Sequence, residues 1–272
     1  MKTLVYQLPK TILFFFVSNL FYSTLLAQEQ NLTEESVNYP TYYFGDPNPL
    51  PSFIFNPKIY PYHKFQGYDF EKTFKEFKKV TLENEWIEVT VFPEVGGKVW
   101  GAVDKSNGNE FVYKNEVAKF RNIAMRGPWT SGGIEFNFGI IGHHPGTGTP
   151  ADYRLDKLSD GSVMCTVGGI DLPSRTQWRV KIILPKDQSA FTTEAVWYNP
   201  TDTEQAYYNW MTAAAAARLD LVFYTPGNQF LTHGGMAKSW PFDPLNRDLS
   251  HYNQNNFGPS KSYHVVGEYN DF

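Results

Sequence analysis

The sequence predicts an all-β domain, built as a sandwich or barrel of antiparallel strands. From Lys79 onward, apolar and polar side chains alternate with a period of two over runs of strand length. Turn-forming residues separate these runs at intervals of about 8–12 residues, which is the spacing typical of sandwiches and barrels. Aromatic residues make up 17 % of the chain, and this share suits both β-structure and contact with carbohydrate.

The first 27 residues have the composition of an export signal. Lys2 and Lys10 give a positive start, and residues 12–26 form an apolar run. That run is short for a membrane span, which needs about 20 apolar residues. Ala27 is a suitable last residue before cleavage, although Leu25 is larger than is usual there. We therefore expect a cleaved signal peptide over 1–27, a periplasmic or secreted protein, and no membrane span after cleavage; the alternative is an uncleaved anchor helix.

Charge and cysteine content narrow the classes of partner. Removal of residues 1–27 takes away two lysines and no acidic residue, so the net charge moves from −4 to −6. No basic stripe is present to neutralise phosphates, and we expect no nucleic-acid partner. Cys165 is the only cysteine and lies in an apolar strand pattern, so we interpret it as a small core residue. We find no dinucleotide or phosphate-loop motif and expect no cofactor.

The expected elements follow in order. Six prolines within residues 28–62 predict an irregular lead-in to a β domain over 63–272. The predicted strands cover residues 87–91, 97–103, 111–113, 161–167, 176–184, 191–198, 205–212 and 221–224. The alanine run 213–217 is interpreted as a buried strand end, and residues 228–272 as long loops.

The segment from Arg126 to Pro145 carries the densest set of polar and aromatic side chains. In a strand, Ile134, Phe136 and Phe138 point to one face, and Gly133, Glu135 and Asn137 point to the other. Trp129 precedes this strand and two histidines follow it. A sugar offers hydroxyls to polar groups and C–H faces to an indole, so we predict the floor of a carbohydrate cleft.

Carboxylates are the candidates for catalysis, because glycoside hydrolysis ordinarily needs a pair of them. Glu135 is the first, as acid or base; it could equally bind sugar or pair structurally with Arg126. Glu268 is the second, with Asp271 as an equal contender, and either could instead be a solvated loop acid. Their separation from Glu135 is undetermined, so a retaining or inverting outcome stays open.

Histidines and aromatic residues complete the predicted site. His143 and His144 are adjacent, so at most one is expected to reach the cleft; we take His144 as a catalytic candidate and His143 as a sugar ligand. The histidines, His233 and His264 included, lack a recognised metal-ligand spacing, and no metal is predicted. The remaining predicted substrate contacts are Arg126, Trp129, Asn137, His233, Trp240 and Tyr263, with Trp129, Trp240 and Tyr263 as stacking platforms.

Several motifs resemble known families. Residues 93–108 and the Asn199-Pro-Thr-Asp202 turn resemble galactose mutarotase-like proteins. Residues 126–129, 132–138, 142–145, 234–241 and 263–272 more closely resemble the DUF5107 family, exported bacterial proteins frequent in Bacteroidetes that often carry tetratricopeptide repeats after the β domain. The resemblance implies a β-supersandwich of twisted antiparallel sheets with a sugar cleft. It also implies further strands beyond Phe272, so that this chain is a C-terminally truncated member.

One departure limits what the resemblance implies about chemistry. Mutarotases use a histidine acid in the strand after the Asn-Pro-Thr-Asp turn, whereas residues 207–213 contain no histidine. An aldose epimerase is therefore the least favoured hypothesis. The leading hypothesis is a glycoside hydrolase-like enzyme acting on oligo- or polysaccharide, and the alternative is a non-catalytic carbohydrate-binding domain.

Overall fold

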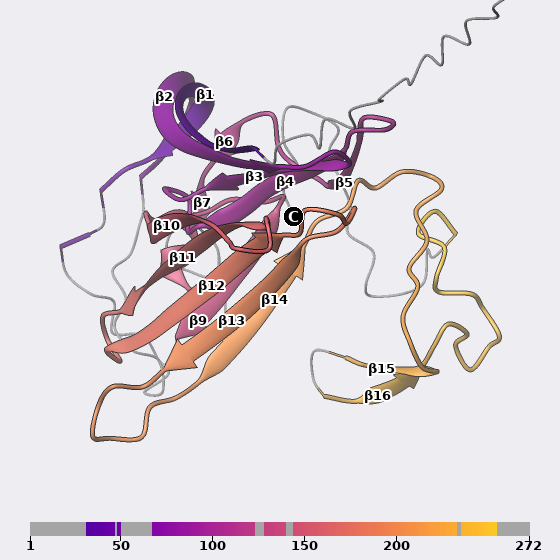
Figure 1. Cartoon of the computed structure of the whole chain (residues 1–272). Helices are drawn as coiled ribbons and strands as arrows, with labels where there is room; N and C mark the ends of the chain where they lie inside the picture. The colour runs from indigo at the N-terminus through magenta and orange to yellow at the C-terminus, as the bar shows by residue number, and fades with distance from the viewer. Residues whose placement is uncertain are drawn as a thin grey trace, which may run out of the picture.

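The computed structural model describes residues 31–46, 48–49, 67–122, 128–139, 144–232 and 235–254 (Figure 1). The predicted signal peptide, 1–27, lies outside these ranges. The described part is all-β, as predicted, and apart from one turn of 3-10 helix it contains no helix. The two main sheets lie one against the other, and a small hairpin of late residues lies apart from them (Figure 1).

The larger sheet has eight strands in the order β14-β9-β4-β3-β2-β1-β6, with β5 paired to β4. Its strands are β1 Asn31–Phe44, β2 Tyr68–Glu83, β3 Ile87–Phe92, β4 Lys98–Asp104, β5 Asn109–Val112, β6 Ala118–Lys119, β9 Ile134–Gly139 and β14 Tyr208–Ala213. The smaller sheet is an antiparallel meander of β10 Asp152–Lys157, β11 Val163–Asp171, β12 Thr176–Leu184 and β13 Thr192–Tyr198. Two small antiparallel sheets have two strands each. One consists of β7 Arg121–Asn122 and β8 Pro128–Trp129, and the other of β15 Gln229–Leu231 and β16 Ala237–Ser239.

The main core fills the space between the two sheets. Alternate residues of β3 and β9, together with Val99 and Ala102 of β4, pack there against alternate residues of β11 and β12. Phe138 of β9 stacks on Trp178 of β12 with ring centroids 5.3 Å apart. Cys165 is fully buried in this core, as predicted, and burial raises the pKa of its thiol to about 12. A thiol with that pKa stays protonated at neutral pH.

A second apolar cluster covers the outer face of the larger sheet. Its rings come from strands that are neighbours in the sheet, so they form a row across that face. Phe92 stacks on Trp100 at 4.9 Å and on Phe77 at 5.7 Å. Tyr39 accepts a hydrogen bond from the Trp100 indole at 3.0 Å, and burial raises the pKa of this tyrosine to about 12. Both faces of the central strands of the larger sheet are therefore packed.

The predicted irregular lead-in is wrong over residues 31–44. These residues form β1, which pairs with β2 in continuous antiparallel register from Asn31 to Tyr42. Pro40 lies within the strand, opposite Phe74. Among the described residues β1 is an edge strand along most of its length, since β6 pairs with it only at Thr41 and Tyr42. An edge strand tolerates proline because one side of its ladder needs no donors.

Most predicted strands are present to within a few residues, but two assignments near the C-terminal part are wrong. Residues 221–224 form only an isolated bridge, between Val222 and His251. The alanine run is not a buried strand end: β14 stops at Ala213, and Ala213 and Ala215 are exposed. The cause is the position of β14 at the end of the sheet, where packing covers it less than it covers the central strands.

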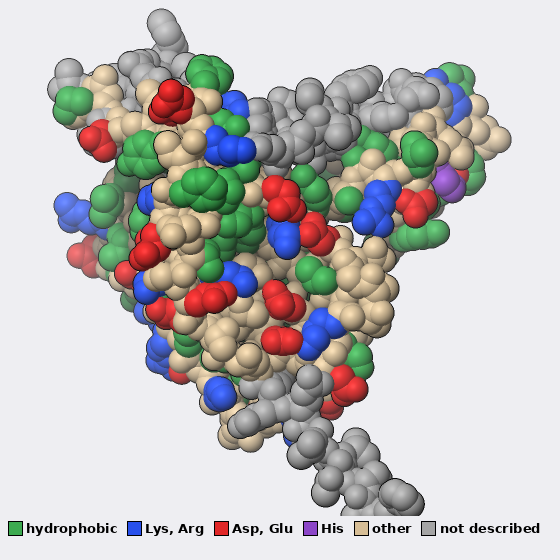
Figure 2. Space-filling view, turned by 90° about the horizontal axis from the view of Figure 1, so that it is seen from above, with side chains coloured by type: hydrophobic (Ala, Val, Ile, Leu, Met, Phe, Trp, Pro, Cys, Tyr) green, Lys and Arg blue, Asp and Glu red, His purple; other side chains and the backbone are tan. Residues whose placement is uncertain are grey.

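The described surface is mixed in charge. Acidic and basic side chains are interspersed on the face that Figure 2 shows, and several form exposed ion pairs such as Lys79–Glu35 at 3.1 Å. Within the described ranges, no helix has the length and apolar character needed to cross a membrane.

Candidate functional site

The candidate site is built on the outer face of β9. Phe136 and Phe138 point into the core between the sheets, and Glu135 and Asn137 point the opposite way, which confirms the predicted alternation. Gly133 precedes the strand with a φ of 67° and lets β9 lie directly against β4, where Val99 pairs with Ile134. The polar residues are nonetheless buried: Glu135 is 3 % exposed and Asn137 is fully enclosed.

Glu135 is held by two side-chain donors. The Trp129 indole N–H donates to Oε2, and the Asn137 amide donates to Oε1. Donors on both oxygens stabilise the ionised carboxylate. Trp129 is brought here by β8, whose Pro128 carbonyl lies against Gly148 of the 3-10 helix η1 Pro145–Gly148. Both oxygens of Glu135 therefore act as hydrogen-bond acceptors in this arrangement.

Lys98 belongs to the same face and was missed by the sequence analysis. It is 2 % exposed, and its ammonium donates to the Thr130 carbonyl, to Thr130 Oγ1 at 3.1 Å and to the Ser131 carbonyl at 3.4 Å. Its Nζ also lies 5.8 Å from the centre of the Trp129 ring. Burial lowers the pKa of Lys98 to about 8, and the negative charge of Glu135 opposes that shift.

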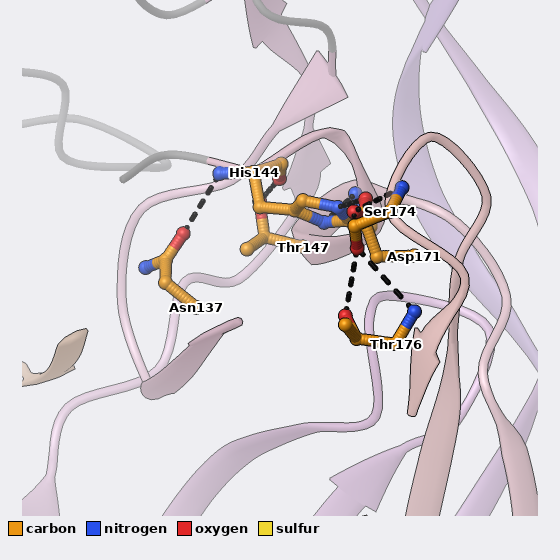
Figure 3. A network of polar contacts seen from close by, with 7 residues as sticks. Asn137, His144, Thr147, Asp171, Ser174 and Thr176 are labelled. Carbon is orange, nitrogen blue, oxygen red and sulfur yellow. Dashed lines mark hydrogen bonds and ion pairs between the residues drawn. The ribbon is translucent and has the colours of Figure 1, made fainter. Parts of the chain in front are cut away.

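His144 extends the network toward the smaller sheet (Figure 3). Its backbone N–H donates to Asn137 Oδ1 at 2.9 Å, and its ring lies against Asp171. The Gly146 N–H donates to Nδ1 at 2.8 Å, so Nδ1 is an acceptor and the ring proton lies on Nε2. Nε2 then donates to Asp171 Oδ1 at 2.7 Å. With both ring nitrogens engaged, His144 fixes the start of η1 as its N-cap.

Asp171 is the carboxylate at the other end of this network, and it too was missed. It ends β11, is 1 % exposed, and accepts from the hydroxyl of Ser174 at 2.5 Å and from its backbone N–H at 3.2 Å. Ser174 in turn contacts the Thr176 hydroxyl at 2.8 Å (Figure 3). Hydrogen bonds thus run without a break from Trp129 through Glu135, Asn137 and His144 to Asp171, and they join β9 to β11.

The structure brings together four of the predicted site residues, namely Trp129, Glu135, Asn137 and His144. Trp240 follows β16, and the centre of its ring lies 6.1 Å from that of Phe230 in β15. The hairpin of β15 and β16 lies apart from β9 (Figure 1). The other predicted residues, Arg126, His143, His233, Tyr263, Glu268 and Asp271, lie outside the described residues. In the part of the chain that is described, no three His, Cys, Asp or Glu side chains gather as a metal site would require.

The fold and site define a class: a two-sheet, all-β domain with a buried polar face on a strand of its larger sheet. A family model, "Domain of unknown function (DUF5107)", matches residues 55–272, and the chain belongs to this family. The structure is also similar to the crystal structure of a TPR-domain containing protein from Parabacteroides distasonis ATCC 8503, with 27 % sequence identity and a TM-score of 0.67. That match covers 74 % of this chain and 35 % of the other, so the chain spans about a third of that protein's length.

Proposed function

We propose that this chain is a carbohydrate-active domain of an exported protein, of the galactose mutarotase-like superfamily, and that it acts as a glycoside hydrolase-like enzyme. The observation that carries the proposal is the carboxylate of Glu135 on β9, which accepts hydrogen bonds from the Trp129 indole and from the Asn137 amide. Carboxylate, amide and indole are the groups that protein sites use to contact sugars. Export rests on the signal-like composition of residues 1–27.

The contacts favour one role for Glu135 over another. A general acid needs a carboxyl that is protonated near neutral pH, whereas donors on both oxygens favour the charged form. Glu135 therefore serves as the base or nucleophile, or as an acceptor for a sugar hydroxyl. In the enzyme hypothesis the acid is a second carboxyl, for which Glu268 and Asp271 are the candidates.

Non-catalytic carbohydrate binding is the second candidate function. It is favoured by the low exposure of Glu135, because a carboxylate fixed by its own neighbours suits a structural or ligand-orienting role. An aldose epimerase is less well supported. β14, the strand after the Asn199–Asp202 turn, lies beside β9 and has the sequence Tyr-Asn-Trp-Met-Thr-Ala, without a histidine acid.

A Glu135→Gln variant tests the proposal. The amide keeps the shape of the side chain and removes its charge, so an enzyme should lose turnover of oligosaccharides by about 100-fold or more while binding changes little. Glu76→Gln, on the exposed surface of β2, is the matched control and should behave as the wild type. Turnover of a panel of oligosaccharides is followed by release of reducing ends, and binding by calorimetry.

The outcomes separate the candidates. Lost turnover with retained binding supports the enzyme. Weakened binding, with no turnover in the wild type either, supports the binding domain. Equal binding and equal turnover in wild type and Glu135→Gln contradict a carbohydrate site at Glu135.

A further inference from the structure

Strand β14 lies beside β9 and sets a row of residues along its polar face. In the antiparallel register, Thr212 is opposite Glu135, Trp210 is opposite Asn137, and Tyr208 is opposite Gly139. Residues directly opposite each other point to the same face of a sheet. The polar row of β9 is therefore bordered by a row that contains two aromatic side chains.

The two rows differ in their access to solvent. Glu135 and Asn137 are buried, whereas Tyr208, Trp210 and Thr212 are each partly exposed. β14 also ends the order of the larger sheet in the part of the chain that is described. A molecule that approaches this face from solution meets the β14 row before it reaches the carboxylate.

The rings themselves are arranged as separate surfaces. Tyr208 and Trp210 have centroids 6.4 Å apart and planes that meet at 64°, so neither ring is stacked flat on the other. Met211, between Trp210 and Thr212, is opposite Phe136, so its side chain points to the other face of the sheet. It is 42 % exposed. Met211 is therefore a suitable control position for substitutions of Trp210.

We propose that Trp210, assisted by Tyr208, is the stacking platform for a pyranose ring that lies on the partly exposed β14 row, at the border of the face that carries Glu135. The apolar C–H face of a sugar packs on an indole, while its equatorial hydroxyls seek polar partners at the ring edge. Trp210 supplies the aromatic face, and Thr212, which is partly exposed on the same row, supplies a polar side chain beside it. This inference rests on the proposed function and names the residue that gives the site its preference for sugar rings.

The test uses calorimetric titration of the full chain with neutral oligosaccharides built from glucose, galactose or mannose units. Trp210→Ala should weaken binding by about tenfold, because the stacking surface is lost. Trp210→Phe should restore most of the affinity, because it keeps an aromatic face. Met211→Ala should bind as the wild type does. Trp210→Leu, which keeps apolar bulk without a π face, replaces the alanine variant if thermal unfolding shows that the latter is not folded.

Each result has one meaning. Wild-type affinity in Trp210→Ala or Trp210→Leu, together with lost turnover in Glu135→Gln, overturns the platform and leaves the proposed function standing. Failure of the wild type to bind any of the oligosaccharides overturns both. Equal losses in Trp210→Ala and Met211→Ala also overturn the platform, because they point to general damage to β14.

Discussion

Gly133→Ala is expected to lower the free energy of unfolding by about 3 kcal/mol or more. Gly133 has a φ of 67°, in the left-handed region, where a side chain adds strain. A Cβ at this position would lie 2.2 Å from the Val99 carbonyl oxygen, which is a backbone atom that cannot turn aside. Either β9 separates from β4 or the turn before β9 changes, and both displace Glu135.

Gly132→Ala is the matched control for this prediction. Gly132 has a φ of 75°, so it carries the same conformational strain, but the nearest atoms to an added Cβ are 3.4 Å away. The free energy of unfolding of Gly132→Ala should therefore fall by only about 1–2 kcal/mol. Urea unfolding of both variants, followed by tryptophan fluorescence, measures the difference. Equal losses would mean that the close approach of β9 to β4 does not constrain the fold.

The stability of the protein should depend on pH through Lys98. Burial lowers the pKa of Lys98 from 10.5 to about 8, so between these values the unfolded chain binds a proton that the folded chain does not. Stability contributed by Lys98 therefore rises with pH through this window. From pH 7 to pH 10 the gain should be about 2–3 kcal/mol.

Lys98→Met removes this titration and keeps a long apolar side chain. Urea unfolding of wild type and variant at pH 7, 8, 9 and 10 isolates the contribution of Lys98, because other titrating groups, such as Tyr39, are common to both proteins. Lys181→Met, at an exposed position of β12, controls for the loss of one positive charge. A difference in the free energy of unfolding between wild type and Lys98→Met that stays constant with pH would show that the pKa of Lys98 is not lowered in the folded protein.

Periodicity predicted the parts of the fold that depend on alternation. Phe136 and Phe138 face the core and Glu135 faces away, because a strand with one apolar row can satisfy its packing in only one register. β1 was not predicted from its proline content, because proline marks the end of a strand or its edge and the sequence does not distinguish the two.

The site was predicted only as far as one strand and its flanks extend. Lys98 was missed because a lysine is assigned to solvent by default, although its position directly after Gly96-Gly97 at the start of an apolar strand was a usable signal. Asp171 is 27 residues from His144, and that pairing depends on how the two sheets meet. His144 was interpreted as part of a strand, but it caps η1, so strand alternation did not apply to it.

A crystal structure of the protein with a bound neutral oligosaccharide tests the proposed site most directly. The expected result is a sugar ring against Trp210, on the partly exposed β14 row beside the face that carries Glu135. The contrary result is a ligand held elsewhere with this face empty. The smaller sheet carries a groove of about 680 Å³, lined in part by Gly168, Arg179 and Glu194. A sugar bound in this groove, and not beside β14, would contradict the proposed site.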